Sequence, residues 1–88
     1  MKVEFTAIFV KDLKKIVRKD ILSKFREIVL EFERTDNLSE IGIIKKLAGS
    51  KNTYRIRIKD YRAGFYIINN SVLFKRFLHR KDIYKYFP

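Results

Sequence analysis

The sequence predicts an α+β fold with the element order β-α-α-β-β-β, in which a helical hairpin packs on one face of a mostly antiparallel sheet. Three observations predict this fold. Residues 2–8 alternate polar and apolar side chains, as a half-buried strand does. Residues 10–32 carry apolar side chains at helical spacing. Three runs rich in β-branched and aromatic residues, 53–59, 61–68 and 71–78, are separated by turn-forming residues.

The first half of the chain supplies the predicted first strand and both helices. Val3 and Phe5 of that strand are expected to face the core. From Val10 onward the apolar side chains follow one helix face, and a break near Lys19-Asp20 is expected to divide two helices. Asp20 would cap the second helix, because its side-chain oxygen can accept hydrogen bonds from free N–H groups of the first turn.

Turns and connectors divide the second half. Residues 37–46 read as a loop and residues 48–52 as a turn. Asn69-Asn70 is expected to join two strands, because asparagine tolerates the positive φ of a tight hairpin. The strand 71–78 has apolar residues on both sides, which is typical of a central strand, and residues 79–87 form a short helical or irregular tail. The loop is expected to be anchored to the core by Ile41, Ile43, Ile44 and Leu47.

Length and composition indicate one domain spanning residues 1–88. The chain has no cysteine and one histidine, which excludes disulfides and cysteine-based zinc sites and disfavours a histidine-based metal site. We therefore expect neither a metal nor a cofactor. The charged first residues and the lack of a long apolar run predict a soluble, intracellular protein.

The net charge of +11 is concentrated in one half of the chain. Residues 1–44 contain nine Lys/Arg and eight Asp/Glu, whereas residues 45–88 contain twelve Lys/Arg and only Asp60 and Asp82. A field this uneven attracts a polyanion, either a nucleic acid or an acidic protein, and an anionic membrane surface is the weaker option. Charge alone does not indicate catalysis.

The strand 53–59 alternates apolar and cationic side chains. Arg55, Arg57 and Lys59 are expected to line one face, about 6–7 Å apart, which is close to the spacing of successive phosphates on a nucleic-acid strand. The opposite face would lie under the helices. Its expected members are Ile56, Ile58, Ala63, Phe65 and Ile67, and those of the open face are Arg55, Arg57, Arg62 and Tyr66.

Such an open face has the residue types that metal-free RNA cleavage requires. Cations would stabilise the charge that develops on phosphorus, and a base and an acid would move protons. Arginine cannot serve as the base, which leaves His79, a tyrosine (Tyr61, Tyr84 or Tyr86) or a lysine whose pKa is lowered by neighbouring cations. Tyr66 and Tyr84 could stack on bases. The alternative is structural: a basic strand face is often solvated or protein-binding, and His79 and the tyrosines would be packing groups.

Four motifs in the second half, taken together, resemble the RelE/ParE superfamily of bacterial toxin–antitoxin toxins. They are Lys45-Lys46-Leu47-Ala48-Gly49, Tyr54-Arg55-Ile56-Arg57-Ile58, Asp60-Tyr61-Arg62 leading into Phe65-Tyr66, and His79-Arg80-Lys81-Asp82-Ile83-Tyr84. The resemblance implies the β-α-α-β-β-β fold, and an antitoxin that wraps the toxin and masks its basic face. RelE-like members cut mRNA in the ribosomal A site, whereas ParE-like members poison DNA gyrase.

The resemblance also implies residue roles. Arg55 and Arg57 match the paired basic positions of one strand, Arg62 the arginine of the next strand, Arg80 the later arginine, and Tyr84 the tyrosine that stacks on the substrate. Two positions depart from the pattern. Arg57 stands where the best-known RelE toxins have the lysine thought to act as base, so His79 would take the proton, and Lys59 stands where a glycine often precedes the turn.

The resulting hypothesis is an mRNA interferase that acts on ribosome-bound mRNA in the cytoplasm and is neutralised by an acidic antitoxin. The alternatives are a gyrase inhibitor of the ParE type and a degenerate toxin that only binds its antitoxin. The predicted catalytic residues are Arg57, Arg62, His79, Arg80 and Tyr84, and the predicted RNA-binding residues are Arg55, Lys59, Tyr66 and Lys81.

Overall fold

The computed structural model describes residues 1–37, 41 and 44–88, and its helices and strands form an α+β fold. The predicted order is confirmed, with one further strand and a C-terminal helix. The elements are β1 (Lys2–Phe5), α1 (Ala7–Lys14), α2 (Lys19–Arg34), β2 (Ile44–Lys46), β3 (Thr53–Ile58), β4 (Tyr61–Ile68), β5 (Ser71–His79) and α3 (Arg80–Tyr86).

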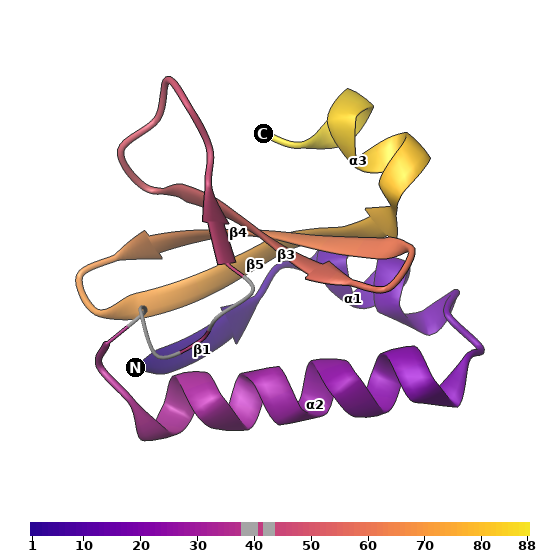
Figure 1. Cartoon of the computed structure of the whole chain (residues 1–88), viewed down its shortest axis with the longest axis horizontal. Coiled ribbons are helices and arrows are strands. Elements are labelled where there is room, and N and C mark those ends of the chain that lie inside the picture. Colours follow the sequence, from indigo (N-terminus) through magenta and orange to yellow (C-terminus); the bar gives the residue numbers. More distant parts are fainter. Residues whose placement is uncertain (38–40, 42–43) are drawn as a thin grey trace.

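The five strands form one sheet in the order β1-β5-β4-β3-β2 (Figure 1). Only the β1–β5 pair is parallel, and the other described pairs are antiparallel. Strand β5 lies between β1 and β4, which confirms its predicted internal position. Asn69 and Asn70 have φ values of 50° and 61°, as the predicted hairpin turn requires.

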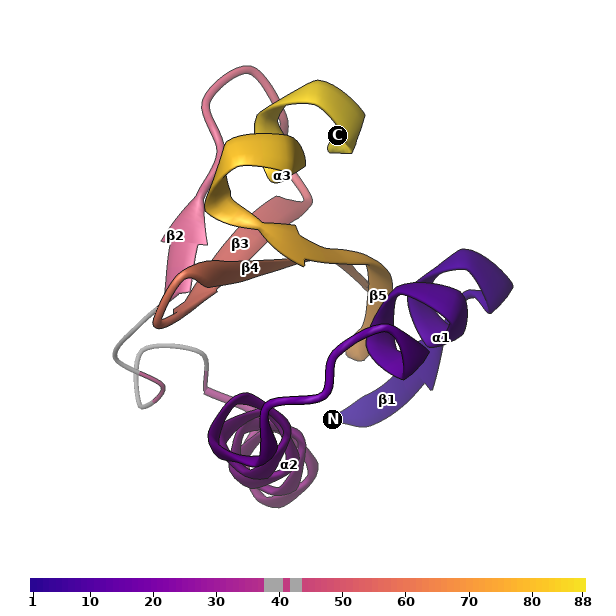
Figure 2. The same ribbon diagram turned by 90° about the vertical axis from the view of Figure 1, so that its right-hand side faces the viewer.

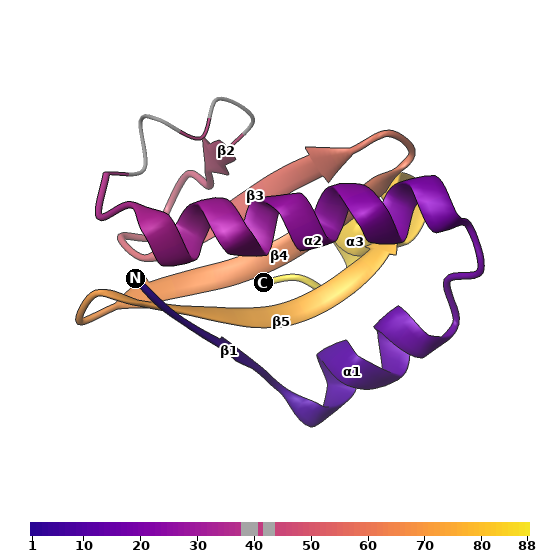
Figure 3. The ribbon, with the colours of Figure 1, turned by 90° about the horizontal axis from the view of Figure 1, so that it is seen from below.

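Helices α2 and α3 lie on opposite sides of the sheet (Figure 2). The side chains of α2 that are buried against the sheet, Ile21, Phe25, Ile28 and Phe32, recur at the spacing of one helix face. On the sheet, Ile56, Ile58, Ala63 and Phe65 are buried as predicted, and Ile67 is half-buried against the same core. Seen from below, α2 lies in front of the sheet and runs roughly along the strands, whereas α1 continues from the end of β1 (Figure 3). The three helices therefore occupy different parts of the sheet surface.

The end of β1 and the N-cap of α2 differ from the prediction, because other residues occupy the capping positions. The first strand ends at Phe5, since the Thr6 hydroxyl accepts a hydrogen bond from the Phe9 N–H at 3.1 Å and starts α1. Phe5 remains 43 % exposed although its ring contacts the core, so its predicted core position is only partly realised. Arg18, and not Asp20, occupies the N-cap position of α2.

The predicted loop 37–46 contains a strand that sequence reasoning missed. Its last residues form β2, which pairs with β3. Ile41 is buried and both Ile44 and Leu47 are half-buried, as expected of anchors, while Ile43 lies outside the described residues. Within the part of the chain that the structure describes, there is no helix long and apolar enough to cross a membrane.

Candidate functional site

The face of the sheet turned away from α2 gathers cations from three strands. Arg57 on β3 lies directly opposite Arg62 on β4. Arg55, two residues from Arg57, lies opposite Lys45 on β2. Directly opposed residues of paired strands project to the same face. The sheet register therefore assembles four cations that are up to seventeen positions apart in the sequence.

These four cations and the ring of Tyr84 line a hollow of about 280 Å³. Tyr84 enters from α3 and is 65 % exposed. The Arg55 guanidinium carbon lies 4.6 Å from the centre of its ring, which is a cation–π contact. The hollow thus places four cationic groups next to an exposed aromatic ring.

Arg62 is held by the backbone of the preceding turn. Its Nη1 donates hydrogen bonds to the carbonyl oxygens of Lys59 at 2.8 Å and Tyr61 at 2.9 Å. Partial burial lowers the pKa of Arg62, and the positive charges of Arg57, Arg55 and Arg80 lower it further, while Tyr84 opposes them. Because like charges are held together here, an anion placed in the hollow would relieve their repulsion.

Helix α3 is fixed to this face by apolar and capping contacts. Ile83 is fully buried and Phe87, just after the helix, is 4 % exposed. The Phe87 ring packs over the backbone of Gly64 and lies 5.6 Å from the ring of Tyr66. His79 caps the helix, since its Nδ1 accepts a hydrogen bond from the Lys81 N–H at 3.2 Å. These contacts hold Tyr84 beside the arginines.

Four of the predicted site residues come together in the hollow, namely Arg55, Arg57, Arg62 and Tyr84. Arg80 is exposed at the start of α3, and its charge reaches Arg62. Lys81 is also exposed on α3. Tyr66 shares the open face as predicted, but its half-buried ring packs against Phe87.

The ring of His79 makes two contacts with neighbouring residues. Its ring makes an edge contact with Tyr61 at 5.7 Å, and its Nδ1 is engaged as the helix cap. The imidazole of His79 thus links the end of β5 to the first turn of α3.

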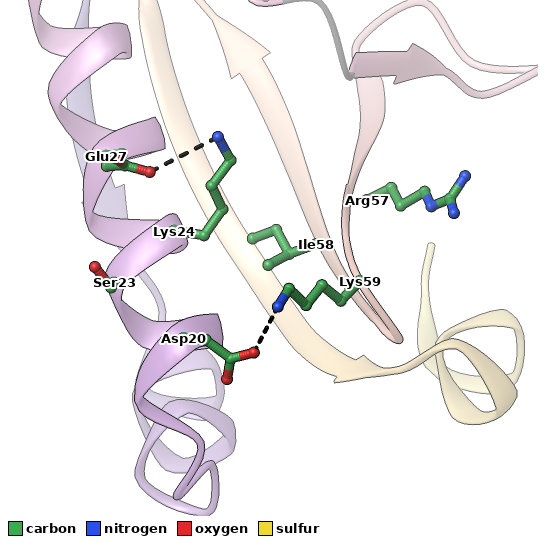
Figure 4. Close-up of a pocket in the computed structure, with 7 residues that line it drawn as sticks. All are labelled: Asp20, Ser23, Lys24, Glu27, Arg57, Ile58 and Lys59. Atoms are coloured by element: carbon green, nitrogen blue, oxygen red, sulfur yellow. Dashed lines mark hydrogen bonds and ion pairs between the residues drawn. The ribbon is translucent and has the colours of Figure 1, made fainter.

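The expectation that Lys59 lines the face of Arg55 and Arg57 is wrong. Strand β3 ends at Ile58, and Lys59 has a φ of 53° in the turn that follows. Its Nζ lies 2.7 Å from Asp20 Oδ2, on the side of α2. Figure 4 shows Lys59 reaching toward α2 while Arg57 points away from that helix.

Asp20 links α2 to this turn, although its side chain is partly exposed. Its carboxylate also accepts hydrogen bonds from Arg18, the shorter at 2.9 Å. These bonds, first from Lys59 and then from Arg18, hold the pKa of Asp20 well below its usual range. The α2 side of the turn therefore carries a salt-bridge network that is separate from the cationic hollow.

Sequence reasoning missed Lys45 as a site residue, because residues 37–46 were interpreted as a loop. The available signal was that Lys45 begins one of the four motifs named in the sequence analysis. The pairing of residues 44–46 with β3, which places Lys45 beside Arg55, is seen only in the structure. A larger hollow of about 630 Å³ lies between α2 and β3 and includes Asp20, Lys24 and Glu27 (Figure 4). Its charges are of both signs and partly paired, which favours the cationic hollow as the site for an anion.

Among the described residues, no three or more His, Cys, Asp or Glu side chains are placed to hold a metal ion. The donors that the cationic hollow offers are guanidinium groups, an ammonium group and a phenol. All of these can donate to phosphate oxygens.

Comparison with known proteins gives the same fold. A relative, toxin RelE3 of Methanocaldococcus jannaschii, is 43 % identical over the full length of both chains. The toxin in a RelB–RelE antitoxin–toxin complex from Methanococcus jannaschii superposes with a TM-score of 0.83 at 39 % identity, covering 97 % of this chain and 99 % of that one. An archaeal RelE–RelB complex from Pyrococcus horikoshii gives 0.73 at 23 % identity, covering 90 % and 93 %. Since the family of the ParE toxin of type II toxin–antitoxin systems also matches residues 3–84, the chain belongs to this toxin family and is a homologue of RelE toxins.

Proposed function

We propose that this toxin is an mRNA interferase, which cleaves RNA through attack of a 2′-hydroxyl on the adjacent phosphate. The observation that carries the proposal is the hollow lined by Lys45, Arg55, Arg57, Arg62 and Tyr84. An in-line attack places extra negative charge on the phosphate oxygens, and preorganised cations stabilise that charge. The products would be a 2′,3′-cyclic phosphate and a free 5′-hydroxyl.

The three arginines and the tyrosine of the hollow would each have a role in this reaction. Arg57 and Arg62, opposite one another on β3 and β4, are suited to grip the scissile phosphate, because guanidinium groups match the geometry of phosphate oxygens. Arg55 would hold a neighbouring phosphate and support Tyr84, whose exposed ring would stack on a base. Arg80 and Lys81, exposed on α3, would contact the strand beyond the hollow.

The proposed substrate is mRNA on the ribosome, and the proposed site of action is the cytoplasm, where ribosomes translate. The homology to RelE toxins supports this substrate. The proposed partner in the resting cell is an acidic antitoxin of the RelB kind. A similar toxin has been crystallised with RelB, and the net charge of +11 favours an acidic partner.

The test is to induce the chain in a bacterial host and map new 5′ ends on a translated mRNA by primer extension. Wild type is expected to arrest growth and to produce cuts in phase with the codons. Arg62→Ala should cleave about 10²–10³-fold more slowly than wild type, which is the effect typical of removing one group that stabilises the charge of the transition state. Lys11→Ala on the exposed side of α1 is the matched control and should keep wild-type toxicity. Toxicity of Arg62→Ala equal to that of wild type would refute the assignment of the hollow.

Inhibition of DNA gyrase is the second candidate, favoured by the match to the ParE toxin family. In that case the same cations would form a protein-binding surface. Growth arrest with DNA breaks and an SOS response, but without new mRNA ends, would support it. Absence of arrest would instead support a toxin that only binds its antitoxin.

A further inference from the structure

We propose that Lys45 is the general acid of the cleavage, which protonates the departing 5′-oxygen. The inference rests on the proposed RNA cleavage and deepens it, because it assigns a proton-transfer residue within the hollow.

The position of Lys45 comes from β2. This short strand pairs with β3 so that Lys45 lies opposite Arg55, and its neighbour Lys46 lies opposite Tyr54. Successive residues of a strand point to opposite faces, so only Lys45 of this pair is directed to the open face. Lys45 accordingly lines the hollow together with the three arginines and Tyr84.

The chemistry of the hollow then favours Lys45 as the acid. Guanidinium groups bind phosphate well but release protons reluctantly, because the ordinary pKa of arginine lies above about 12. Ammonium and phenol groups, whose ordinary pKa values are about 10.4 and about 10, hold a proton at neutral pH and can still release it to an alkoxide. Among the described residues that line the hollow, only Lys45 and Tyr84 are of these types.

The ring of Tyr84 already takes part in a cation–π contact. Arg55 lies over the face of its ring, which is the arrangement of a stacking platform, and its position is set by the packing of α3. Lys45 has a flexible side chain on an edge strand and is exposed, so its Nζ can follow the leaving oxygen. His79 caps α3 through Nδ1 and is engaged against Tyr61.

Cleavage by this route conserves atoms, electrons and protons. The 2′-oxygen forms a bond to phosphorus while its proton passes to a solvent water molecule. The bond between phosphorus and the 5′-oxygen breaks, its electron pair goes to that oxygen, and Lys45 Nζ supplies the proton. The neutral amine then regains a proton from solvent, so no oxidant, reductant or further co-reactant is consumed.

The experiment compares two mRNAs on programmed ribosomes, one natural and one with sulfur replacing the bridging 5′-oxygen at the mapped cut site. A thiolate leaves without protonation, so this substrate does not need a general acid. On natural RNA, both Lys45→Arg and Lys45→Ala should cleave about 10²–10⁴-fold more slowly than wild type. On the sulfur substrate, Lys45→Arg, which keeps the positive charge, should recover the wild-type rate, and Lys45→Ala should lose much less than it does on natural RNA. Lys46→Ala is the matched control and should resemble wild type on both.

Three results would overturn the inference. Equal losses on both substrates would mean that Lys45 only binds phosphate. Full activity of Lys45→Arg on natural RNA would mean that its charge alone matters. Selective rescue of Tyr84→Phe, without rescue of the Lys45 variants, would make Tyr84 the acid. Failure of wild type to cut either RNA would refute the proposed function itself, a result distinct from these three.

Discussion

Gly64 shows how one residue sets the position of a whole helix. It lies on β4 opposite Arg55, and the ring of Phe87 packs directly over it. A Cβ added at this position would lie 2.6 Å from the Cγ and Cε2 atoms of Phe87, closer than carbon atoms can approach. The absence of a side chain at residue 64 is therefore what allows the tail after α3 to close on the sheet.

Gly64→Ala is expected to destabilise the protein by about 1–3 kcal/mol, the usual cost of overpacking. Urea unfolding measures this cost. The conformation of the backbone adds no further strain, since Gly64 is not among the residues with positive φ.

The control repeats Gly64→Ala in a Phe87→Ala variant, which lacks the ring that the new methyl group would contact. Phe87→Ala alone should cost about 3–5 kcal/mol, because Phe87 is almost fully buried. In that background, Gly64→Ala should add little. If the two costs were simply additive, the contact between residues 64 and 87 would not be their cause.

At the scale of elements, one ion pair joins α1 to β5 and α3. Asp12 on α1 is 5 % exposed and accepts hydrogen bonds from Arg76 Nε at 2.8 Å and from the Phe77 N–H at 3.0 Å. The Arg76 guanidinium also lies 5.2 Å from the ring of Tyr86 on α3. The anchoring of α3, and so the position of Tyr84, thus depends partly on a residue from the other half of the chain.

Asp12→Ala is expected to lower the free energy of unfolding by about 3–5 kcal/mol, because it leaves the partly buried Arg76 and the Phe77 N–H without their acceptor. Chemical denaturation measures this loss. Asp82→Ala, at an exposed position of α3, is the control and should change stability by less than about 0.5 kcal/mol. A similar stability for both variants would show that the Asp12 pair does not hold these elements together.

At the scale of the whole molecule, the concentration of positive charge in residues 45–88 should make RNA binding depend strongly on salt. Four cations line the hollow. If each neutralises one phosphate of a single strand, log K should fall with log salt concentration with a slope of about −3. Fluorescence anisotropy with a labelled single-stranded RNA measures the slope.

Arg62→Ala removes one of these cations and should make the slope shallower by about 0.7. Lys11→Ala, on α1, should leave the slope unchanged. A slope that does not respond to Arg62 would show that RNA binds the chain through its general charge and not through the hollow.

The fold and four of the five residues that line the cationic hollow could be predicted from the sequence. The alternation in Tyr54-Arg55-Ile56-Arg57-Ile58 gave the correct facing for the two arginines, and the asparagine pair gave the correct turn. The same alternation failed at Lys59, because the strand had already ended and the left-handed turn redirected the side chain to Asp20. Periodicity predicts facing only within a strand, so a residue one position beyond its end is outside the rule.

The sequence by itself determined the elements and the charge, because both depend on local spacing and on composition. The β-α-α-β order, the apolar faces of α2 and β3 and the cationic second half follow from residues close together in the chain. The tertiary structure alone decided which residues meet. Pairing of β2 with β3 brought Lys45 to Arg55, packing of α3 brought Tyr84 over the same face, and His79 became the cap of α3. Such contacts depend on register and packing between distant segments, which local periodicity does not record.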